Sequence, residues 1–323
     1  MNLLKIFTFL IIVASTLAAP ITLKSKYKIS YKKATNVNFY KNLSLDVYYN
    51  ERNFKKSTEL PVVIFIHGGF WLNGDKSTYN KAGELLQKEG YVVVIPNYTV
   101  FINNPNVTID DMVDDIYHAV EWTFNNISKY GGDHSKITLS GHSSGAHLAA
   151  LTLIKTDFGI KNNGKILNKL PVLKHALFLN APYTIDLNEA IKQLNGANLG
   201  QIALGLMKLF TNAKNTFPLD ILTSMNKRIN SLSAKQVTIL DTENDLLIPS
   251  IVAKAFMIQI QRTTKKTSVD YVLLQDSNDA VKPDAYGGHN RIIVNLFDSH
   301  KEIDVSAKNL LLNVIEKYNK SNL

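Results

Sequence analysis

A serine held between small residues is the part of this sequence best suited to covalent chemistry. Residues 141–145 read Gly-His-Ser-Ser-Gly, after an apolar run that starts at Ile137 and before a helix-forming segment that reaches Ile154. A serine at the tip of a strand-to-helix turn is held exposed beside a base, and flanking glycines let the strand and the helix approach each other. The stretch therefore predicts a nucleophile elbow with Ser143 as the nucleophile.

An acyl-transfer serine needs a base to take its proton and a carboxylate to orient that base. After a nucleophile of this kind the partners follow in the order acid, then histidine. The apolar run that ends at Leu240 is followed by three carboxylates. We predict Asp245 as the acid because it lies in the loop, whereas Asp241 still belongs to the end of the run. Glu243 is the alternative acid.

The base is predicted to be His289. It stands in residues 286–291, Tyr-Gly-Gly-His-Asn-Arg, where glycines leave the imidazole room to reach the serine. His142 and His147 flank the serine but precede the acid, so the chain order predicts packing roles for them. Other histidines stand on a predicted helix, at a strand start or in loops: His118, His134, His175 and His300. No pair of histidines with a nearby carboxylate suggests a metal site, and we predict neither a metal nor a cofactor.

Residues 67–71, His-Gly-Gly-Phe-Trp, follow another apolar run and are suited to bind a developing oxyanion. Glycines let the main chain pass close to a substrate, so the backbone N–H groups of Gly69 and Phe70, with that of Ser144, are the predicted donors. An ordinary turn is the alternative for two glycines after a strand. Phosphate binding is excluded because neither glycine-rich stretch has a Gly-x-Gly-x-x-Gly or Gly-Lys-Ser/Thr pattern.

Buried strands and helices alternate along the chain, which predicts the α/β class with a mostly parallel central sheet flanked by helices. A capping box is expected at Thr108–Asp111. Residues 183–232 contain helical patterns but no strand, so we expect a helical cap inserted over the carboxyl edge of the sheet, where ligands of open α/β folds bind. Two antiparallel strands are expected within residues 27–50, buried strands at 61–66, 91–95, 137–139, 175–180, 236–241 and 269–274, and helices at 79–89, 109–127, 146–154, 248–261 and 305–318.

One segment of the predicted cap, residues 199–210, is apolar on nearly every face of a helix. Exposed apolar area costs about 25 cal/mol per Å², so we expect this helix to bury two sides. Both sides could pack on the domain. The alternative hypothesis is that Leu206 and Met207 roof a pocket above the serine, with Phe70 and Trp71 below, and bind one apolar arm of a substrate.

Composition excludes several function classes. The chain has 323 residues, of which 45% are hydrophobic and 20% charged, enough for one large α/β domain. It has no cysteine, so thiol catalysis and thiolate metal sites are excluded. The net charge of +9 comes from lysines scattered singly and in pairs without interleaved aromatic residues, so no nucleic-acid partner is expected. No pattern specifies an oligomeric state.

The first 18 residues have the pattern of a cleaved secretory signal, with Lys5, an apolar centre and small residues at Thr16 and Ala18. Because the apolar run is shorter than the roughly 20 residues of a membrane span, cleavage is favoured over an anchor. We expect a signal peptide at 1–18, a hydrolase-type domain at 19–323 and a secreted or lumenal glycoprotein without a stable membrane span after cleavage. Five sequons are present, at Asn42, Asn97, Asn106, Asn126 and Asn319.

Several of these stretches together resemble one enzyme family. Beside the His67–Trp71 motif, residues 108–115 read Thr-Ile-Asp-Asp-Met-Val-Asp-Asp, and residues 125–150 contain the elbow. The sequence is similar to the α/β-hydrolase superfamily, in the carboxylesterase branch with a His-Gly-Gly-x-Trp motif, and resembles its prenylcysteine methylesterases and kynurenine formamidases. The similarity covers about residues 62–155 and short segments around Asp245 and His289.

The resemblance implies an α/β-hydrolase fold, with acid and base at Asp245 and His289 and oxyanion amides at Gly69 and Phe70. Relatives often carry Asp-Tyr-Arg where residues 97–99 read Asn-Tyr-Thr, so a structural arginine contact is missing. The secretory signal also does not fit a cytosolic formamidase.

Motifs and resemblance together predict a serine carboxylic-ester hydrolase that acts on small-molecule esters, either small or apolar ones. A formamidase-like amidase and a prenylcysteine methylesterase are alternative activities. The non-enzymatic alternative is a binding module on a hydrolase fold, but such modules usually lack a triad residue and none is missing from this sequence.

Overall fold

A computed structural model describes residues 30–51, 59–196, 200–211, 213–275, 288–293 and 305–319. The described side chains exclude those of residues 193–199. The predicted signal peptide, residues 286–287 and His300 lie outside the described residues. The signal peptide and the secretory location therefore stay predictions.

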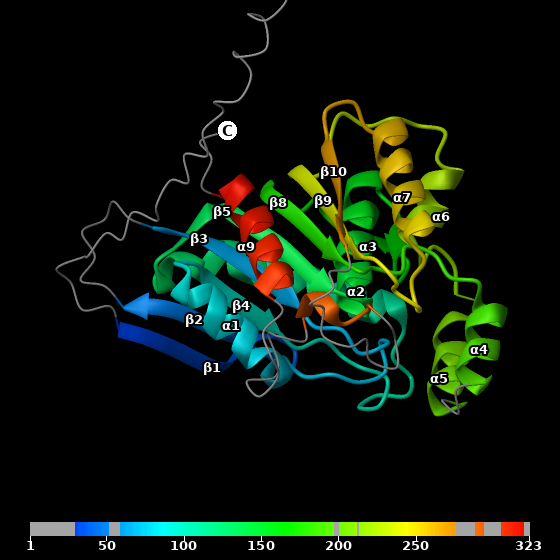
Figure 1. The fold of residues 1–323 in the computed structure, drawn as a ribbon, viewed down its shortest axis with the longest axis horizontal. Helices are drawn as coiled ribbons and strands as arrows, with labels where there is room; N and C mark the ends of the chain where they lie inside the picture. Colours follow the sequence, from blue (N-terminus) through cyan, green and yellow to red (C-terminus); the bar gives the residue numbers. More distant parts are fainter. Residues whose placement is uncertain are drawn as a thin grey trace, which may run out of the picture.

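An eight-stranded sheet forms the centre of the described chain (Figure 1). Its strands lie in the order β1-β2-β4-β3-β5-β8-β9-β10, and the six from β4 to β10 run parallel to one another. Strands β1 and β2 add an antiparallel edge. The bounds are β1 Ser30–Tyr40, β2 Leu43–Glu51, β3 Leu60–Ile66, β4 Val92–Pro96, β5 Gly132–His142, β8 Leu173–Leu179, β9 Ala234–Thr242 and β10 Ser268–Leu274, with a separate hairpin of β6 Lys161–Asn162 and β7 Lys165–Ile166. This mostly parallel sheet confirms the predicted fold class.

Helices cover both faces of the sheet (Figure 1). Helices α1 and α9 pack on one face, and α2, α3 and α7 on the other. The side chains of β3 divide accordingly, since Val62, Ile64 and Ile66 join the larger core while Val63 and Phe65 join the smaller one. A strand buried on both faces reads as a continuous apolar run, which is why it could be predicted. The helix bounds are α1 Asn80–Lys88, α2 Ile109–Asn126, α3 Ser144–Phe158, α7 Ser250–Thr263 and α9 Val305–Asn319, with short 3₁₀ turns at Lys76–Tyr79 and Ile127–Tyr130.

The segment 183–232 contains three helices, α4 Leu187–Gly196, α5 Gly200–Phe210 and α6 Pro218–Ser224. Helices α4 and α5 lie side by side at the edge of the described chain (Figure 1). The expectation that α5 buries two sides is wrong. Its inner face is buried, but Leu204 and Met207 on the outer face are 48% and 43% exposed. Single apolar side chains on a surface are tolerated because polar area alone cannot cover a folded protein.

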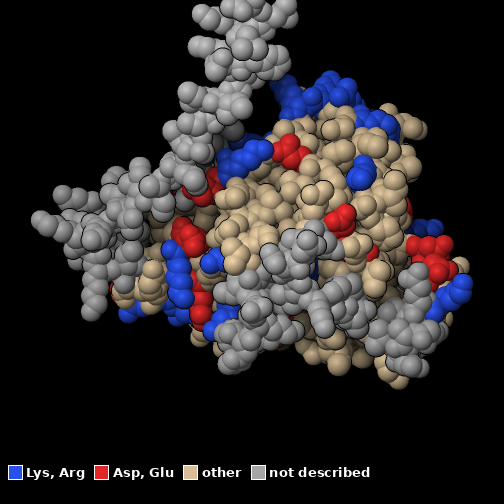
Figure 2. Space-filling view, viewed as in Figure 1, with Lys and Arg blue, Asp and Glu red and all other residues tan. Residues whose placement is uncertain are grey.

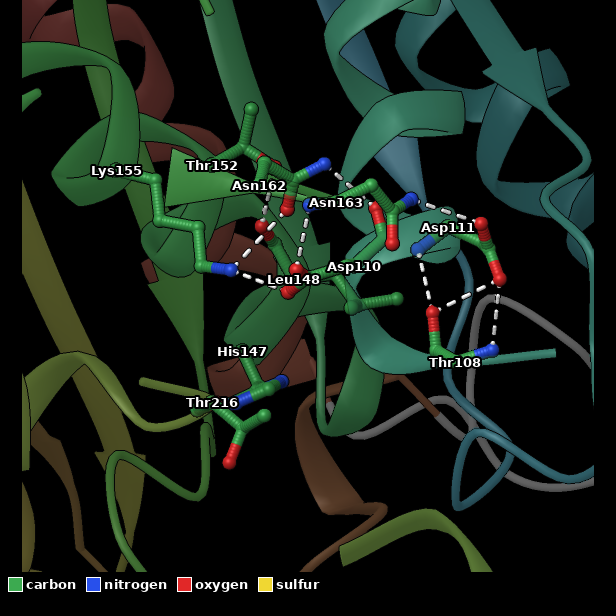
Figure 3. A network of polar contacts seen from close by, with 10 residues as sticks. All are labelled: Thr108, Asp110, Asp111, His147, Leu148, Thr152, Lys155, Asn162, Asn163 and Thr216. Carbon is green, nitrogen blue, oxygen red and sulfur yellow. Dashed lines mark hydrogen bonds and ion pairs between the residues drawn. The ribbon is translucent and has the colours of Figure 1, made fainter. Parts of the chain in front are cut away.

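The expected capping box starts α2, and this prediction is confirmed. The Thr108 hydroxyl accepts a hydrogen bond from the Asp111 N–H at 3.1 Å, and the Asp111 carboxylate accepts one from the Thr108 N–H at 2.9 Å (Figure 3). The two reciprocal bonds satisfy backbone donors that the first turn of a helix leaves without intrahelical partners.

A buried lysine ties α3 to the start of α2. The Lys155 side chain is fully buried, and its ammonium forms an ion pair with Asp110 and donates to Asn162 Oδ1 at 3.1 Å (Figure 3). Asp110 also accepts a hydrogen bond from the Asn163 N–H at 2.7 Å. The helix that follows Ser143 is therefore anchored to α2 and to the β6–β7 hairpin.

The strand end where relatives often carry arginine is held by other contacts. Asn97 Oδ1 accepts from the Lys76 N–H at 2.6 Å, and its amide nitrogen donates to Asp75 at 2.7 Å. The Thr99 N–H donates to Asp115 at 2.9 Å. The Asn97 amide, part of one predicted sequon, is thus occupied within the fold.

Lysines that are distant in sequence come together at the amino ends of neighbouring strands. Lys136, Lys174 and Lys235 lie in β5, β8 and β9, and burial followed by the charges of Lys235 and Lys136 lowers the pKa of Lys174. Figure 2 shows basic side chains grouped at one end of the visible face and interspersed with acidic ones elsewhere. The sequence, which shows these lysines one at a time, did not indicate this grouping.

The ion pair in Figure 3 predicts a stability effect. Asp110→Ala is expected to lower the free energy of unfolding by about 3 kcal/mol, because it leaves the buried Lys155 ammonium without its counter-charge. Urea unfolding of Asp110→Ala and of Asp220→Ala, an exposed aspartate on α6, measures the difference; the control is expected to change by less than about 1 kcal/mol. Adding Lys155→Met to Asp110→Ala is expected to recover part of the loss, and equal losses in Asp110→Ala and the control would contradict the prediction.

Candidate active site

The elbow between β5 and α3 holds Ser143 in a strained backbone conformation, with φ 52° and ψ −126°. Its N–H donates to the Leu179 carbonyl at 2.9 Å, which fixes the turn to the neighbouring strand β8. Gly145 is required by packing, since a Cβ there would lie 2.3 Å from the His67 carbonyl oxygen. A Cβ at Gly141 would meet the Gly145 carbonyl carbon at 2.7 Å. The glycines therefore allow the close approach that sequence reasoning assigned to them.

The structure brings Ser143, His289 and Asp245 together. His289 Nε2 lies 2.9 Å from Ser143 Oγ, and His289 Nδ1 lies 2.7 Å from Asp245 Oδ2. A carboxylate beside Nδ1 favours the tautomer with the proton on that nitrogen, which leaves Nε2 as an acceptor for the serine hydroxyl. Both Ser143 and His289 are more than nine-tenths buried. The arrangement suits proton transfer from the serine to the imidazole.

The Asp245 carboxylate is fixed at both oxygens. Oδ2 also accepts a hydrogen bond from the Asn180 amide at 2.7 Å, and Oδ1 accepts from the N–H groups of Leu247 and Ile248 at 2.9 Å each. Burial raises the pKa of Asp245, but the contacts to His289, Asn180 and the backbone outweigh it, so that pKa lies below its ordinary value. Asp245 therefore stays ionised, as a carboxylate that orients an imidazole must.

The loops that carry acid and base are joined to each other. The Gly288 N–H donates to the Asn244 carbonyl at 2.9 Å, and a Cβ at Gly288 would lie 2.4 Å from the Glu243 carbonyl oxygen. Glu243, the alternative acid, contributes its backbone to this junction, and its N–H bonds to the Leu274 carbonyl. The carboxylate that contacts His289 is that of Asp245.

Asp241, the other carboxylate weighed from the sequence, is buried in β9 rather than placed in the loop. Tyr271 donates to its Oδ2 at 3.3 Å, and its Oδ1 has no hydrogen-bond partner among the residues that the structure describes. Burial, followed by the negative charge of Asp245, raises the pKa of Asp241 to about 7. The two neighbouring carboxylates thus have opposite electrostatic environments.

The loop after β3 turns beside Ser143. Three successive residues have positive φ, 130° at Gly69, 56° at Phe70 and 61° at Trp71. A Cβ at Gly68 would lie 3.3 Å from the Ser143 Cβ, so the main chain there runs against the nucleophile. Ser144 is the first residue of α3, where a backbone N–H has no intrahelical acceptor. The amides of Gly69, Phe70 and Ser144 are thus the candidate oxyanion donors.

His142 supports the catalytic loop, a role that chain order did not indicate. Its Nε2–H donates to the His289 carbonyl at 3.0 Å, and burial lowers its pKa to about 3. His67 donates from Nδ1 to the Gly68 carbonyl at 2.9 Å, and burial lowers its pKa to about 4. The described histidines farther away pack in the fold: His118 stacks on Tyr40, His134 contacts Phe124, and His175 bonds to Thr238.

The predicted substrate-binding residues differ in exposure. Trp71 and Leu206 are buried, Phe70 is partly buried, and Met207 is 43% exposed. The Trp71 indole N–H donates to His147 Nδ1 at 3.0 Å, so its polar edge is occupied within the protein. The inner face of α5 contacts the loop after β3, since a Cβ at Gly205 would lie 2.6 Å from Leu72.

Neither a metal-binding cluster nor a membrane-spanning helix occurs among the described residues. No group of three or more histidine, aspartate or glutamate side chains there is arranged to hold a metal ion. Within the same ranges, every helix is too short or too polar to cross a bilayer.

Comparison with known proteins adds the following. The family model BD-FAE matches residues 45–175. A probable isoprenylcysteine alpha-carbonyl methylesterase of Oryza sativa subsp. japonica is 41% identical over 105 residues, 32% of this chain and 24% of the relative. The kynurenine formamidase of Drosophila melanogaster is 27% identical over 157 residues, 48% of this chain and 47% of the relative. The chain thus spans less than half the length of these curated relatives.

Solved structures support the fold over a longer stretch. Esterase B from Lactobacillus rhamnosis aligns with 90% of this chain and 86% of its own, with a TM-score of 0.64 and 17% sequence identity. At that identity the likeness establishes the architecture. Together with the matched motifs it confirms the expected resemblance to α/β-hydrolases of the carboxylesterase type.

The buried Asp241 predicts a pH-dependent stability. Its pKa is about 7 in the folded protein and near the ordinary 3.8 when unfolded, so its contribution is fully present below about pH 4 and is lost as the pH rises to about 7. Asp241→Asn removes this loss. Urea unfolding is measured at pH 4, 6 and 8. The free energy of unfolding of the variant, relative to that of the unmodified protein, is expected to rise with pH by about 1.4 kcal/mol per pH unit, a few kcal/mol in total. Asp220→Asn is the control, and a pH-independent difference for Asp241→Asn would contradict the assignment.

Proposed function

Because this chain has the α/β-hydrolase fold and resembles esterases of that fold, we propose that it is a serine carboxylic-ester hydrolase with Ser143 as nucleophile, His289 as base and Asp245 as acid. The observation that carries the proposal is the hydrogen-bonded series from Asp245 through His289 to Ser143, with distances of 2.7 and 2.9 Å. One carboxylate and one hydroxyl at these distances, on the two nitrogens of one imidazole, match the geometry that serine acyl transfer requires.

In the proposed reaction, Ser143 Oγ attacks the acyl carbon of the ester while its proton passes to His289 Nε2. The carbonyl oxygen becomes an oxyanion, and the amides of Gly69, Phe70 and Ser144 donate hydrogen bonds to it. Protonated His289 then gives its proton to the leaving alcohol. Water, deprotonated by the same imidazole, attacks the acyl-enzyme and releases the acid together with the free serine.

Two local features favour this chemistry. The carboxylate of Asp245 is ionised and accepts from His289 Nδ1, so it stabilises the imidazolium that forms. Ser144 begins α3, and the positive end of a helix dipole favours an anion at that position. The proposed reaction requires neither a metal nor a cofactor.

The substrate is proposed to be a small, apolar ester. Support comes from the packing of α5 on the loop after β3, where Phe210 meets Trp71 edge to face with ring centroids 4.9 Å apart. In this proposal Phe70 and Trp71 form one wall of an apolar chamber and Leu206, on the buried face of α5, the other, whereas the exposed Met207 lies outside it. The alternative activities are hydrolysis of a prenylcysteine methyl ester and of an arylformamide, as the names of the two curated relatives suggest.

The triad proposal predicts a common loss of activity. Ser143→Ala, His289→Ala and Asp245→Asn are each expected to lower kcat by about 10⁴-fold or more while leaving the protein folded, and double variants are expected to be scarcely worse than singles. Ester hydrolysis and fluorophosphonate labelling at Ser143 are the measurements. Asp241→Asn and Glu243→Gln are matched controls. If either control is inactive while Asp245→Asn works normally, the acid has been assigned wrongly.

The chamber proposal predicts a substrate preference. Esters with an aromatic or long alkyl group are expected to have a higher kcat/KM than acetylated sugars, and Leu206→Ser is expected to reduce that preference by about tenfold, since one apolar group in a pocket contributes on that scale. Turnover of a minimal acetate ester is expected to persist. Ile258→Ser, at an exposed position on α7, is the control.

A panel that also contains a prenylcysteine methyl ester and an arylformamide separates the alternative activities. Preference for acetylated carbohydrate would refute the chamber. Equal losses on apolar and minimal esters would show that α5 serves the core alone.

A further inference from the structure

One imidazole joins the loop after β3 to the helical segment of residues 183–232. His147, on the first turn of α3, accepts a hydrogen bond from the Trp71 indole N–H at 3.0 Å through Nδ1. Through Nε2 it lies 2.7 Å from the carbonyl oxygen of Thr216. Figure 3 shows His147 and Thr216 next to each other, apart from the polar network around Lys155.

The two contacts fix the protonation of this histidine. An indole N–H can only donate and a carbonyl oxygen can only accept. Nδ1 of His147 must therefore be unprotonated and Nε2 must carry the proton. The side chain is fully buried, and burial lowers its pKa to about 3, so the ring stays neutral and keeps both bonds at ordinary pH.

Aromatic side chains enclose the same imidazole. Trp71 meets the His147 ring edge to face at 5.1 Å, and Phe217 lies 5.3 Å from it. Phe210 of α5 stacks on Phe217 at 4.9 Å and contacts Trp71 at the same distance. Thus His147 and Trp71 together contact Phe210, Thr216 and Phe217 by hydrogen bonding and by ring packing.

The loop that this contact holds is strained. Phe70 and Trp71 are both non-glycine residues with positive φ, a conformation that costs on the order of 1–3 kcal/mol each and persists only when the surroundings impose it. Rotation of either residue would change the direction of the Phe70 N–H, one of the candidate oxyanion donors. The hydrogen bond to the Trp71 side chain is placed to resist that rotation.

We propose that His147 is a positioning residue that holds the oxyanion loop in its working conformation through Trp71 and couples that loop to the helical segment through Thr216. The inference rests on the proposed function, because it assigns His147 a role in stabilising the oxyanion of the same reaction. It makes Phe210, Thr216 and Phe217 a support for catalysis in addition to any part they have in substrate choice.

The test compares substitutions that keep or remove the two hydrogen bonds. His147→Leu removes both and Trp71→Phe removes the indole donor while keeping an aromatic ring. His147→Gln restores an acceptor and a donor on one side chain. His175→Leu is the matched control, since His175 is another fully buried histidine, on β8, away from the loop.

His147→Leu is expected to lower kcat by about 10²-fold, the scale of a misplaced catalytic group, with KM changed by less than about threefold. Trp71→Phe is also expected to lower kcat. His147→Gln is expected to recover most of the activity that His147→Leu loses. The inhibition constant of a trifluoromethyl ketone, whose adduct with Ser143 places an oxyanion at the same donors, is expected to rise in proportion to the loss in kcat/KM. His175→Leu is expected to keep its kcat and its inhibition constant.

Unchanged kcat in both His147→Leu and Trp71→Phe would overturn the proposal, as would a loss of kcat without weaker binding of the ketone. If His147→Leu does not fold, the kcat values and inhibition constants of Trp71→Phe and His147→Gln decide the question. Fluorophosphonate labelling of Ser143 in the unmodified protein distinguishes failure of the proposed function from failure of this inference. Absence of labelling and of ester hydrolysis refutes the proposed function. An active unmodified protein with fully active His147→Leu and Trp71→Phe variants refutes only the role of His147.

Discussion

The backbone strain at Ser143 is the constraint on which the rest of the site depends. A residue with a side chain adopts φ 52° only where the surrounding structure forces it to. Here the bond from its N–H to Leu179 and the contact of Gly145 with the His67 carbonyl oxygen fix the turn between two strands. The ion pair between Lys155 and Asp110 then ties the carboxyl-terminal part of α3 to α2. The position of one hydroxyl is therefore set by the packing of the sheet and two helices.

Burial and hydrogen bonding determine which groups around the Ser143 hydroxyl are charged. Asp245 is kept ionised by the groups that donate to it, while Asp241, with one oxygen unpaired, is driven toward the neutral acid. His142 and His147 are buried so deeply that their pKa values fall to about 3, and both remain neutral hydrogen-bonding groups. Negative charge is thus concentrated at the carboxylate that orients His289, and the neighbouring imidazoles do not compete with it.

The features that could be predicted from sequence are those encoded locally. Strand β3 is a continuous apolar run because both its faces are buried, and α2 begins at Ile109 because Thr108 and Asp111 form a capping box there. The position of Asp245 in the loop, beyond the strand end that holds Asp241, was enough to select it, and the structure puts Asp245 beside His289. The sequence could not indicate the exposed flank of α5, because apolar periodicity does not say how much of a helix its neighbours cover.

Contacts between distant segments were not predictable for a similar reason. The bond from Trp71 to His147 joins residues 76 apart, and no pattern in either segment specifies the other as its partner. Lys155 read as one lysine among many, although it is fully buried against Asp110. The two-residue strands β6 and β7 are too short to have a period. Such features depend on the assembled fold, not on local propensity.

The spacing of the triad along the chain has a consequence for biosynthesis. Ser143 and His289 are 146 residues apart, and Asp245 is 44 residues from His289. A ribosome that has made the elbow, the sheet up to β10 and the acid loop has still produced no imidazole for the serine. The nascent polypeptide therefore lacks the complete hydrogen-bonded series until translation passes residue 289 of 323. Interrupted translation products that end before this point carry Ser143 without the imidazole that we propose as its base.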